Sequence, residues 1–415
     1  MTAPAPYGIV WAILVYAWIA NYLIRMALSA LLPPIMTEFG LSYAEAGLLS
    51  AAVFYAYASM QLPAGVLGDR LGRKRLVIAG VLLSAGASVF TGLAGTLVAL
   101  FAARLATGLS QGFLFSNDRV IIAATTPRSR IALGQGISFS GPGLGTTLGL
   151  VLAGYLGTLL PWRHVFLLFG LPPLLAAILI WRYIPEPPHA AAAADPAWPF
   201  TRVLRTRDFW LLAISGMVPI YVQFLLATWG PALFVEAGVS DLARSASLAS
   251  LQGLTAPAGL LVSGLVADRL RARGYHGKVM IAAALAGSAL SVLAMAFVIQ
   301  GHGQRQGAAW LLTLALLATS FFIWCCWGPA YAILGDLVPS PVLGRTFGAF
   351  NTICFLGAVA SPFVTGWLRD LSGSFVAGLL GAAALSALAV VGMMALDRPF
   401  RLTASSRGVA GPPRP

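Results

Sequence analysis

Long apolar stretches follow one another along almost the whole chain, from Trp11 to about Leu396, and short polar interruptions separate them. Each stretch has the roughly 20 mostly apolar residues that a helix needs to cross a bilayer. No soluble core could use this much apolar surface, so the pattern predicts an all-α membrane protein with about twelve transmembrane helices. The predicted spans are 9–32, 44–67, 76–93, 97–124, 134–160 and 164–184, followed by 209–235, 244–267, 279–299, 308–335, 346–368 and 373–396.

A Pro- and Ala-rich stretch divides these spans into two sets of six. We expect an N-terminal six-helix bundle over 1–184, a cytoplasmic linker over 185–208, a C-terminal six-helix bundle over 209–396 and a disordered cytoplasmic tail over 397–415. The halves also resemble each other, because GVLGDRLGRKR (65–75) follows the second span and GLVADRLRARG (264–274) follows the eighth. A repeat at half-length predicts two pseudo-symmetric bundles with a site at their interface near the middle of the membrane, which is typical of a transporter.

Membrane topology explains the net charge of +13 better than nucleic-acid binding does. The chain is 59% hydrophobic and 9% charged, whereas about 25% of the residues in a typical soluble domain are charged. With the N-terminus in the cytoplasm, most of the 26 Lys and Arg residues lie on cytoplasmic segments, as the positive-inside rule requires. We therefore expect a multi-pass protein of the bacterial inner membrane, with both termini cytoplasmic. The expected partners are the lipid bilayer and a small substrate, with no nucleic acid, and the expected state is a monomer.

A polar motif lies between the second and third spans, where Gly65, Asp69, Arg70, Gly72, Arg73 and Lys74 form G-x-x-x-D-R-x-G-R-K. Gly65 would permit close helix approach, Gly72 a tight turn, and Asp69 a contact with a neighbouring helix N-terminus. The motif, its position and the span count resemble the major facilitator superfamily. The resemblance implies a loop that controls opening of the transporter. Its residues here would be Gly65, Asp69, Arg70, Gly72 and Arg73, with Asp268 and Arg269 in a degenerate second copy.

Apart from Arg182 and Arg244 at the ends of two spans, three arginines lie within the predicted spans: Arg25, Arg104 and Arg119. Arg119 is beside Asp118 near the end of the fourth span, where we expect local pairing. Arg25 and Arg104 lie deeper, where an ionised side chain costs at least about 2.5–3.5 kcal/mol and usually faces a cavity. The acidic residues all fall in loops or within about two turns of a predicted membrane surface. The cavity should therefore be net positive, and because guanidinium groups hold carboxylates bidentately, we predict an organic anion as the substrate.

Helical spacing groups further residues with these arginines. Tyr22 shares a face of the first span with Arg25. Arg104, Gly108 and Gln111 form one stripe of the fourth span, in which Gly108 is expected to leave room between the two polar side chains. The sequence therefore predicts a polar-lined cavity.

Segments around the arginines resemble the organic-anion branch of the superfamily: the anion:cation symporters, including bacterial sugar-acid transporters, and their relatives sialin and the vesicular glutamate transporters. The segments are YLIRMALS (22–29), YASMQLPAGVLGDRLGRK (57–74), RLATGLSQGF (104–113) and PRSRIALGQGISFSGPGLG (127–145). By this resemblance, Arg25 and Arg104 match substrate-linked arginines, and Tyr22 and Tyr57 match tyrosines that line the site. Tyr331 and Asn351 stand where polar binding residues are expected in the second half. Gln111 is expected to orient the anion together with the tyrosines.

Two departures from the branch concern proton coupling. Ile24 and Gln111 stand where its proton-coupled members have acidic residues that carry the proton. Glutamine forms hydrogen bonds but does not titrate. We therefore predict a uniporter or an anion exchanger, or coupling through another residue, for which Asp336 near the end of the tenth span is the candidate.

The alternative is a drug or metabolite exporter of the same superfamily. SGPGLG (140–145) resembles the G-P-x-x-G element of proton-driven drug exporters. Gly141, Gly145 and Gly149 form a ridge that would also serve helix packing. Exporters of cations usually need a buried carboxylate, which is not evident here. Because no nucleophile–base pair, metal cluster or phosphate loop is evident either, we expect a transporter rather than an enzyme, with no cofactor and no metal.

Overall fold

The computed structural model describes residues 6–127, 130–187, 201–273, 277–302, 307–337 and 340–396, and helices are the only regular elements in these ranges. Eleven of them are long and apolar enough to cross a membrane. This finding confirms the prediction of an all-α, multi-pass membrane protein. Of the predicted linker, 188–200 lies outside the described residues, and so does the predicted tail.

The first seven helices are α1 (Tyr7–Phe39), α2 (Tyr43–Leu71), α3 (Arg73–Leu93), α4 (Leu97–Thr125), α5 (Ile131–Leu159), α6 (Trp162–Phe169) and α7 (Leu171–Tyr183). The short helix α8 (Thr201–Leu204) follows, and then α9 (Arg207–Glu236), α10 (Leu242–Ser250), the 3-10 turn η2 (Leu251–Leu254) and α11 (Thr255–Ala272). The chain continues with α12 (Lys278–His302), α13 (Ala308–Cys325), α14 (Trp327–Leu337), α15 (Ser340–Ser372) and α16 (Val376–Met394).

Each predicted span corresponds to a helix or to a broken helix. The span 44–67 is the 29-residue α2, which is not one of the eleven helices counted above. Three spans are interrupted: 164–184 at Gly170, 244–267 at η2 and 308–335 at Cys326. Prolines explain these interruptions, because Pro172, Pro257 and Pro329 each lack the N–H that would continue the helix ladder one turn back.

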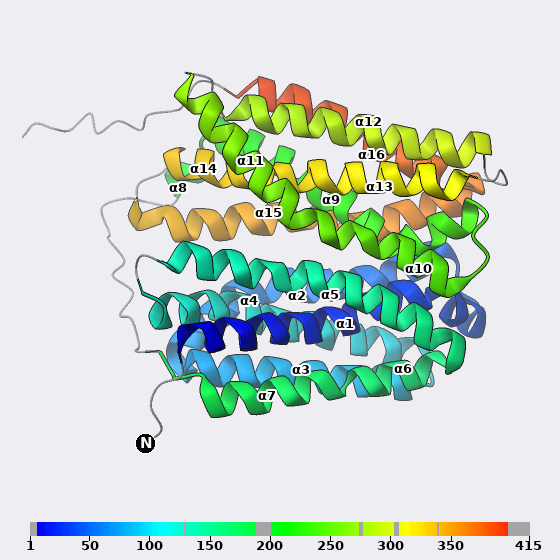
Figure 1. Cartoon of the computed structure of the whole chain (residues 1–415), viewed down its shortest axis with the longest axis horizontal. Helices are drawn as coiled ribbons and strands as arrows, with labels where there is room; N and C mark the ends of the chain where they lie inside the picture. Colours follow the sequence, from blue (N-terminus) through cyan, green and yellow to red (C-terminus); the bar gives the residue numbers. More distant parts are fainter. Residues whose placement is uncertain are drawn as a thin grey trace, which may run out of the picture.

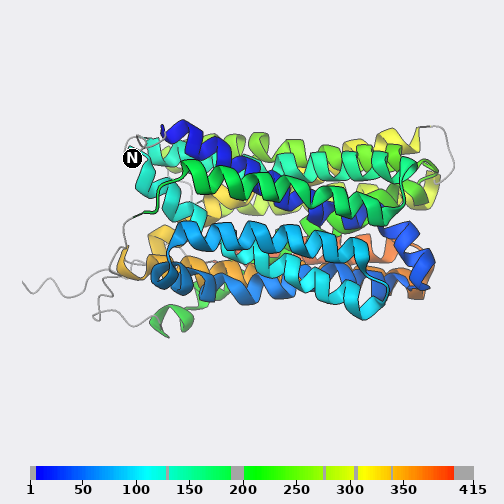
Figure 2. The same ribbon diagram turned by 90° about the horizontal axis from the view of Figure 1, so that it is seen from below.

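The helices run along roughly one common direction, with α1–α7 on one side of the molecule and α9–α16 on the other (Figure 1). Figure 2, which views the molecule from below, brings α1–α7 to the front. In the first group α1 packs along α5, and in the second α12 packs along α16.

The two groups meet most closely along α2 and α15 and along α5 and α10. A Cβ atom at Gly47 would collide with the Pro362 carbonyl, and one at Gly366 with the Tyr43 carbonyl. These positions lie in the first part of α2 and the later part of α15. The groups are therefore pressed together at the end of the molecule where α2 begins.

The predicted glycine ridge packs α5 against α1. Cβ atoms at Gly141 and Gly145 would lie 2.6 and 2.5 Å from the Cβ atoms of Trp18 and Tyr22. Gly108 has the same function in α4, where it faces the Val53 carbonyl of α2. The expectation that Gly108 leaves room for a cavity is therefore wrong, since a backbone occupies that space.

Candidate substrate-binding site

A cavity of about 210 Å³ lies between the two groups of helices. Its walls include Trp18 in the first half of α1 and Phe115 in the second half of α4, so it lies nearer to the end where α1 begins. The lining residues are Trp18, Tyr22, Tyr57, Phe115, Arg119, Pro142, Ile220, Gln223, Phe224, Leu260, Trp324, Trp327, Gly328, Tyr331, Asn351 and Phe355. Of the predicted binding residues, Tyr22, Tyr57, Tyr331 and Asn351 are in this set.

Arg25 lies just beyond the inner end of this cavity and is only 5% exposed. Its Nη1 donates to the Tyr22 hydroxyl at 3.2 Å and to Gln111 Oε1 at 3.0 Å. Its Nε and Nη2 are buried without a hydrogen-bond partner among the described residues, and no carboxylate pairs with it in that part of the chain. The guanidinium therefore keeps its charge and two free donors.

Aromatic rings enclose this guanidinium. Its central carbon lies 4.3 Å from the ring centre of Phe54, 4.8 Å from that of Phe224, 5.0 Å from Tyr22 and 6.0 Å from Tyr57. Such contacts stabilise a cation without neutralising it. Tyr22, Tyr57 and Phe224 also line the cavity, so a single layer of rings separates Arg25 from the open space.

Gln111 is fully buried between α1 and α4. While its Oε1 accepts from Arg25, its Nε2 faces the Asn21 carbonyl oxygen at 3.5 Å. The amide thus positions the guanidinium and adds no charge.

Arg104 is placed differently from Arg25. Its Nη2 donates to Thr91 Oγ1 at 2.7 Å, its Nη1 faces the Ile24 carbonyl oxygen at 3.5 Å, and its guanidinium lies 5.1 Å from the ring centre of Phe166. The side chain is fully buried and does not line the cavity. Arg104 thus joins α4 to α1, α3 and α6 in this conformation, and its direct contact with substrate stays a prediction.

A carboxylate next to the site, that of Asp118, is buried, which the sequence did not predict. Asp118 is fully buried and accepts hydrogen bonds from Trp18 Nε1 at 2.7 Å and Ser138 Oγ at 3.2 Å. It also pairs with Arg119 Nε at 3.3 Å, and Arg119 Nη1 donates to Gln135 Oε1 at 3.1 Å. Because Asp118 and Arg119 neutralise each other, they leave the charge of Arg25 uncompensated.

The second half contributes a smaller polar group. The Tyr331 hydroxyl donates to Asn351 Oδ1 at 2.8 Å, which brings these two predicted residues together. Gln223 of α9 also lines the cavity, and no hydrogen bond to it occurs within the described ranges. In the sequence, Gln223 stands out only as a single amide inside an apolar span.

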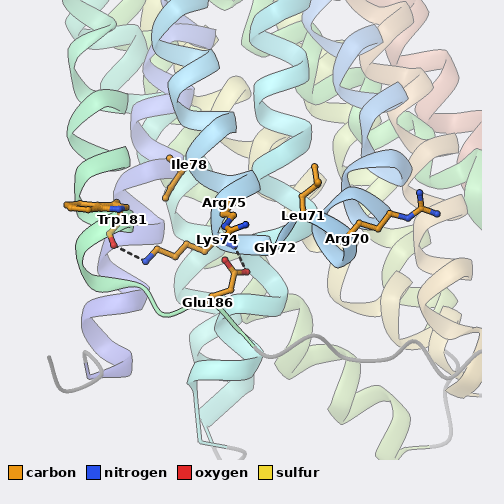
Figure 3. A pocket seen from close by; sticks show the side chains of 8 residues that line it. All are labelled: Arg70, Leu71, Gly72, Lys74, Arg75, Ile78, Trp181 and Glu186. Atoms are coloured by element: carbon orange, nitrogen blue, oxygen red, sulfur yellow. Dashed lines mark hydrogen bonds between the residues drawn. The ribbon is translucent and has the colours of Figure 1, made fainter. Parts of the chain in front are cut away.

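The loop that carries the G-x-x-x-D-R-x-G-R-K motif lies at the end of the molecule where α1 begins. Gly72 has φ +97°, so the predicted tight turn is present. Figure 3 shows Arg70, Lys74 and Arg75 around a surface pocket of about 420 Å³ with Trp181 and Glu186. The Lys74 backbone N–H donates to Glu186 Oε1 at 3.1 Å, and Lys74 Nζ donates to the Trp181 carbonyl at 2.8 Å. The start of the predicted linker is thus tied to this loop.

The remaining predicted gating residues have varied surroundings. Arg73 Nη1 donates to Asn117 Oδ1 at 3.2 Å, and Arg269 is exposed. No described atom lies within 4 Å of a Cβ at Gly65, so the close helix approach expected there is absent in this conformation. The side chains of Asp69 and Asp268 lie outside the described part of the structure.

Comparisons with known proteins agree with this architecture. The family model described as the Major Facilitator Superfamily matches residues 14–362. A Cupriavidus necator protein named "Probable sulfoacetate transporter" is 25% identical over 407 residues, which cover 91% of this chain and 92% of that protein. The hexuronate transporter of Bacillus subtilis is 24% identical over 400 residues, which cover 92% of this chain and 93% of that protein.

A solved structure has the same fold. It is a bacterial homologue of the human lysosomal transporter Spinster, in an inward-facing and occupied conformation, with a TM-score of 0.78 at 18% identity. The likeness covers 96% of this chain and 98% of that one. With the family model matching most of its length, the chain belongs to the Major Facilitator Superfamily and is a membrane transporter rather than an enzyme.

Proposed function

We propose that this protein is a secondary transporter of small organic anions, mono- or dicarboxylates, that works by alternating access as a uniporter or exchanger. The site is the central cavity together with Arg25. The protein would lie in the bacterial inner membrane as a monomer with both termini cytoplasmic, two six-helix bundles (1–184 and 209–396) rocking about this site, and the loop with Asp69 and Arg70 controlling opening.

The observation that carries the proposal is the uncompensated charge of Arg25. A buried cation is costly unless it is paired, and the described structure gives this one only neutral partners. Its Nε and Nη2 can donate two parallel hydrogen bonds to a carboxylate. Binding of the anion would therefore supply the missing charge and satisfy both free donors.

The surrounding residues have distinct functions in this proposal. Gln111 holds the guanidinium in position, and rotation of the Tyr22 and Tyr57 rings would admit the carboxylate. Arg104 adds positive potential from behind the site. Tyr331 and Asn351 would contact the part of the substrate that faces α14 and α15.

The relatives support an anionic substrate. Sulfoacetate and hexuronates, which appear in the names of two relatives, both carry acidic groups that are ionised at neutral pH. The absence of a titratable group at Gln111 and Ile24 favours transport that is not driven by protons through these positions.

Uptake into proteoliposomes tests the proposal directly. The purified chain is reconstituted and supplied with labelled carboxylates, inorganic phosphate or a cationic dye, with and without a pH gradient. Carboxylate uptake that persists when the pH gradient is collapsed is the expected result. Proton-driven movement of the dye without carboxylate uptake would instead establish the exporter, for which the aromatic lining of the cavity is also suitable.

A further inference from the structure

The central cavity is lined mainly by rings. Nine of its sixteen lining residues are aromatic, and only Arg119, Gln223 and Asn351 carry other polar side chains. The aromatic residues come from both groups of helices: Trp18, Tyr22, Tyr57 and Phe115 from one, and Phe224, Trp324, Trp327, Tyr331 and Phe355 from the other.

Most of these rings contact another ring of the lining. On the first side, the ring centres of Trp18 and Phe115 are 6.1 Å apart, and those of Phe115 and Tyr57 are 6.2 Å apart. Tyr57 then meets Phe355 of the other side at 4.9 Å. On that side Trp327 and Tyr331 lie 5.9 Å apart, with 32° between their planes. These separations are typical of packed aromatic pairs.

Some of the polar groups at this site already have partners. The Tyr331 hydroxyl is bonded to Asn351, the Tyr22 hydroxyl to Arg25, and Arg119 to Asp118 and Gln135. Among the non-aromatic polar lining residues, Gln223 alone forms no hydrogen bond within the described ranges. Within the described ranges, the polar side-chain groups of the lining that keep no partner are the Gln223 amide, the Asn351 amide nitrogen, the Tyr57 hydroxyl and the indole N–H groups of Trp324 and Trp327. The cavity therefore offers a ligand single, scattered polar groups set among aromatic rings.

We propose that the preferred cargo is an aryl carboxylate, an acid whose body is an apolar ring, rather than a polyhydroxylated sugar acid. This inference rests on the proposed function, since it assigns the carboxylate to Arg25. The ring would lie between Trp18 and Phe115 of the first group and Trp324 and Trp327 of the second. A hexuronate brings several hydroxyl groups, and each hydroxyl buried without a partner loses its hydrogen bonds to water.

The dimensions limit the size of the acid. A cavity of about 210 Å³ is smaller than the roughly 300–1,000 Å³ of sites for drug-sized ligands, so it suits a single ring. Because one layer of rings separates the cavity from Arg25, a short methylene chain between ring and carboxylate would bridge that distance. 3-Phenylpropionate has this form.

The first experiment compares four ligands by isothermal titration calorimetry on the purified full-length chain. They are 3-phenylpropionate, D-glucuronate, propionate and the neutral 3-phenylpropan-1-ol. We expect 3-phenylpropionate to bind at least about tenfold more tightly than each of the others, because it alone combines the carboxylate with a buried ring. Equal or tighter binding of D-glucuronate would overturn the inference and leave the proposed function standing. Equal binding of the alcohol, or no binding of any acid, would overturn both.

The second experiment tests the ring contact with two variants of one helix, α13. Trp324 lines the cavity, whereas Trp310 is 66% exposed on the outer surface. Trp324→Leu should weaken 3-phenylpropionate binding about tenfold and leave propionate binding unchanged, while Trp310→Leu should change neither. The retained propionate binding reports a folded variant. Equal losses of affinity for both acids in Trp324→Leu would overturn the ring contact. If that variant does not fold, the four-ligand comparison on the native chain still tests the preference for an aryl carboxylate.

Discussion

Arg25 donates a hydrogen bond to Gln111, with 3.0 Å between Nη1 and Oε1. The glutamine oxygen orients the guanidinium but leaves its full positive charge available to a ligand. This pairing of a buried cation with a neutral amide, instead of a carboxylate, is the electrostatic basis of the proposed anion site.

The variant Gln111→Glu should neutralise the positive charge that Arg25 offers to a ligand. A carboxylate at this distance would pair with Arg25 and compete with the substrate, so we expect anion affinity at neutral pH to fall at least about tenfold. Binding should return when the medium is acidified enough to protonate the new glutamate. Titration of the variant with the best-bound carboxylate at several pH values measures both effects.

Gln111→Met is the matched control, since it removes the hydrogen bond and adds no charge. Its loss of affinity should be smaller than that of Gln111→Glu and independent of pH. Equal losses of affinity in the two variants would mean that Gln111 only orients Arg25 and that the charge at this position has no effect.

Lysine replacements should separate the two deep arginines. Arg25→Lys keeps the charge but loses the fork that holds a carboxylate, so affinity should fall at least about tenfold with little change in melting temperature. Arg104→Lys loses a hydrogen bond to Thr91 or Ile24 and the stacking on Phe166, so its main effect should be a lower melting temperature. Binding and thermal unfolding of both variants in detergent give the comparison. If Arg104→Lys lost binding at unchanged stability, Arg104 would be a substrate contact after all.

The packing of α5 on α1 should control the position of Tyr22. A Cβ at Gly145 would lie 2.5 Å from Tyr22 Cβ and 3.1 Å from Ile19 Cα. Gly145→Ala must push α1 away, which typically costs about 1–3 kcal/mol, and it should also weaken anion binding because Tyr22 bonds Arg25. Thermal unfolding and titration measure the two effects. Gly136→Ala on the same helix is the control, since no described atom lies within 4 Å of its Cβ, and an equally large effect there would refute the packing argument.

The sequence predicted the spans well because apolar length determines eleven of them. It did not predict the breaks at Gly170, η2 and Cys326, since a proline also fits inside a continuous helix, as Pro142 does in α5. Arg25 was predicted to lack a carboxylate partner, and the described structure agrees, because the missing acids could be read directly from the chain.

Tertiary contacts account for the features that the sequence did not reveal. Arg25 is level with Gln111 of α4, whereas Arg104 lies seven residues earlier on α4, about two helical turns further from the cavity. Only Arg25 therefore reaches the rings that line the cavity. The contact of Glu186 with Lys74 joins residues 112 positions apart. The sequence alone does not distinguish core rings from cavity rings in α13 and α14, because their placement depends on how the two groups of helices meet.

The end of the molecule opposite the cavity is closed by a contact between the groups. The carboxylate of Asp370, near the end of α15, accepts hydrogen bonds from the backbone N–H groups of Tyr43 at 3.0 Å and Ala44 at 2.7 Å. These N–H groups form the first turn of α2, where the helix dipole favours negative charge. Beside them, Arg369 pairs with Glu236 at 3.2 Å and lies 4.8 Å from the Tyr43 ring centre. Opening this end must break the Asp370 cap.

Asp370→Ala should therefore shift the population toward the state that is open at this end. Removing a helix cap costs about 1 kcal/mol, which corresponds to about a fivefold change in the ratio of closed to open molecules. Spin labels at Thr37→Cys on α1 and Ser372→Cys on α15 report the separation of the two groups, and the longer distance should gain population. Asp241→Ala is the matched control, because Asp241 caps α10 within its own group by accepting from the Ala243 N–H at 3.0 Å. That variant loses a comparable cap without freeing the other group, so its distance distribution should match that of the native chain. An unchanged distribution in Asp370→Ala, or the same shift in both variants, would contradict a closing function for Asp370.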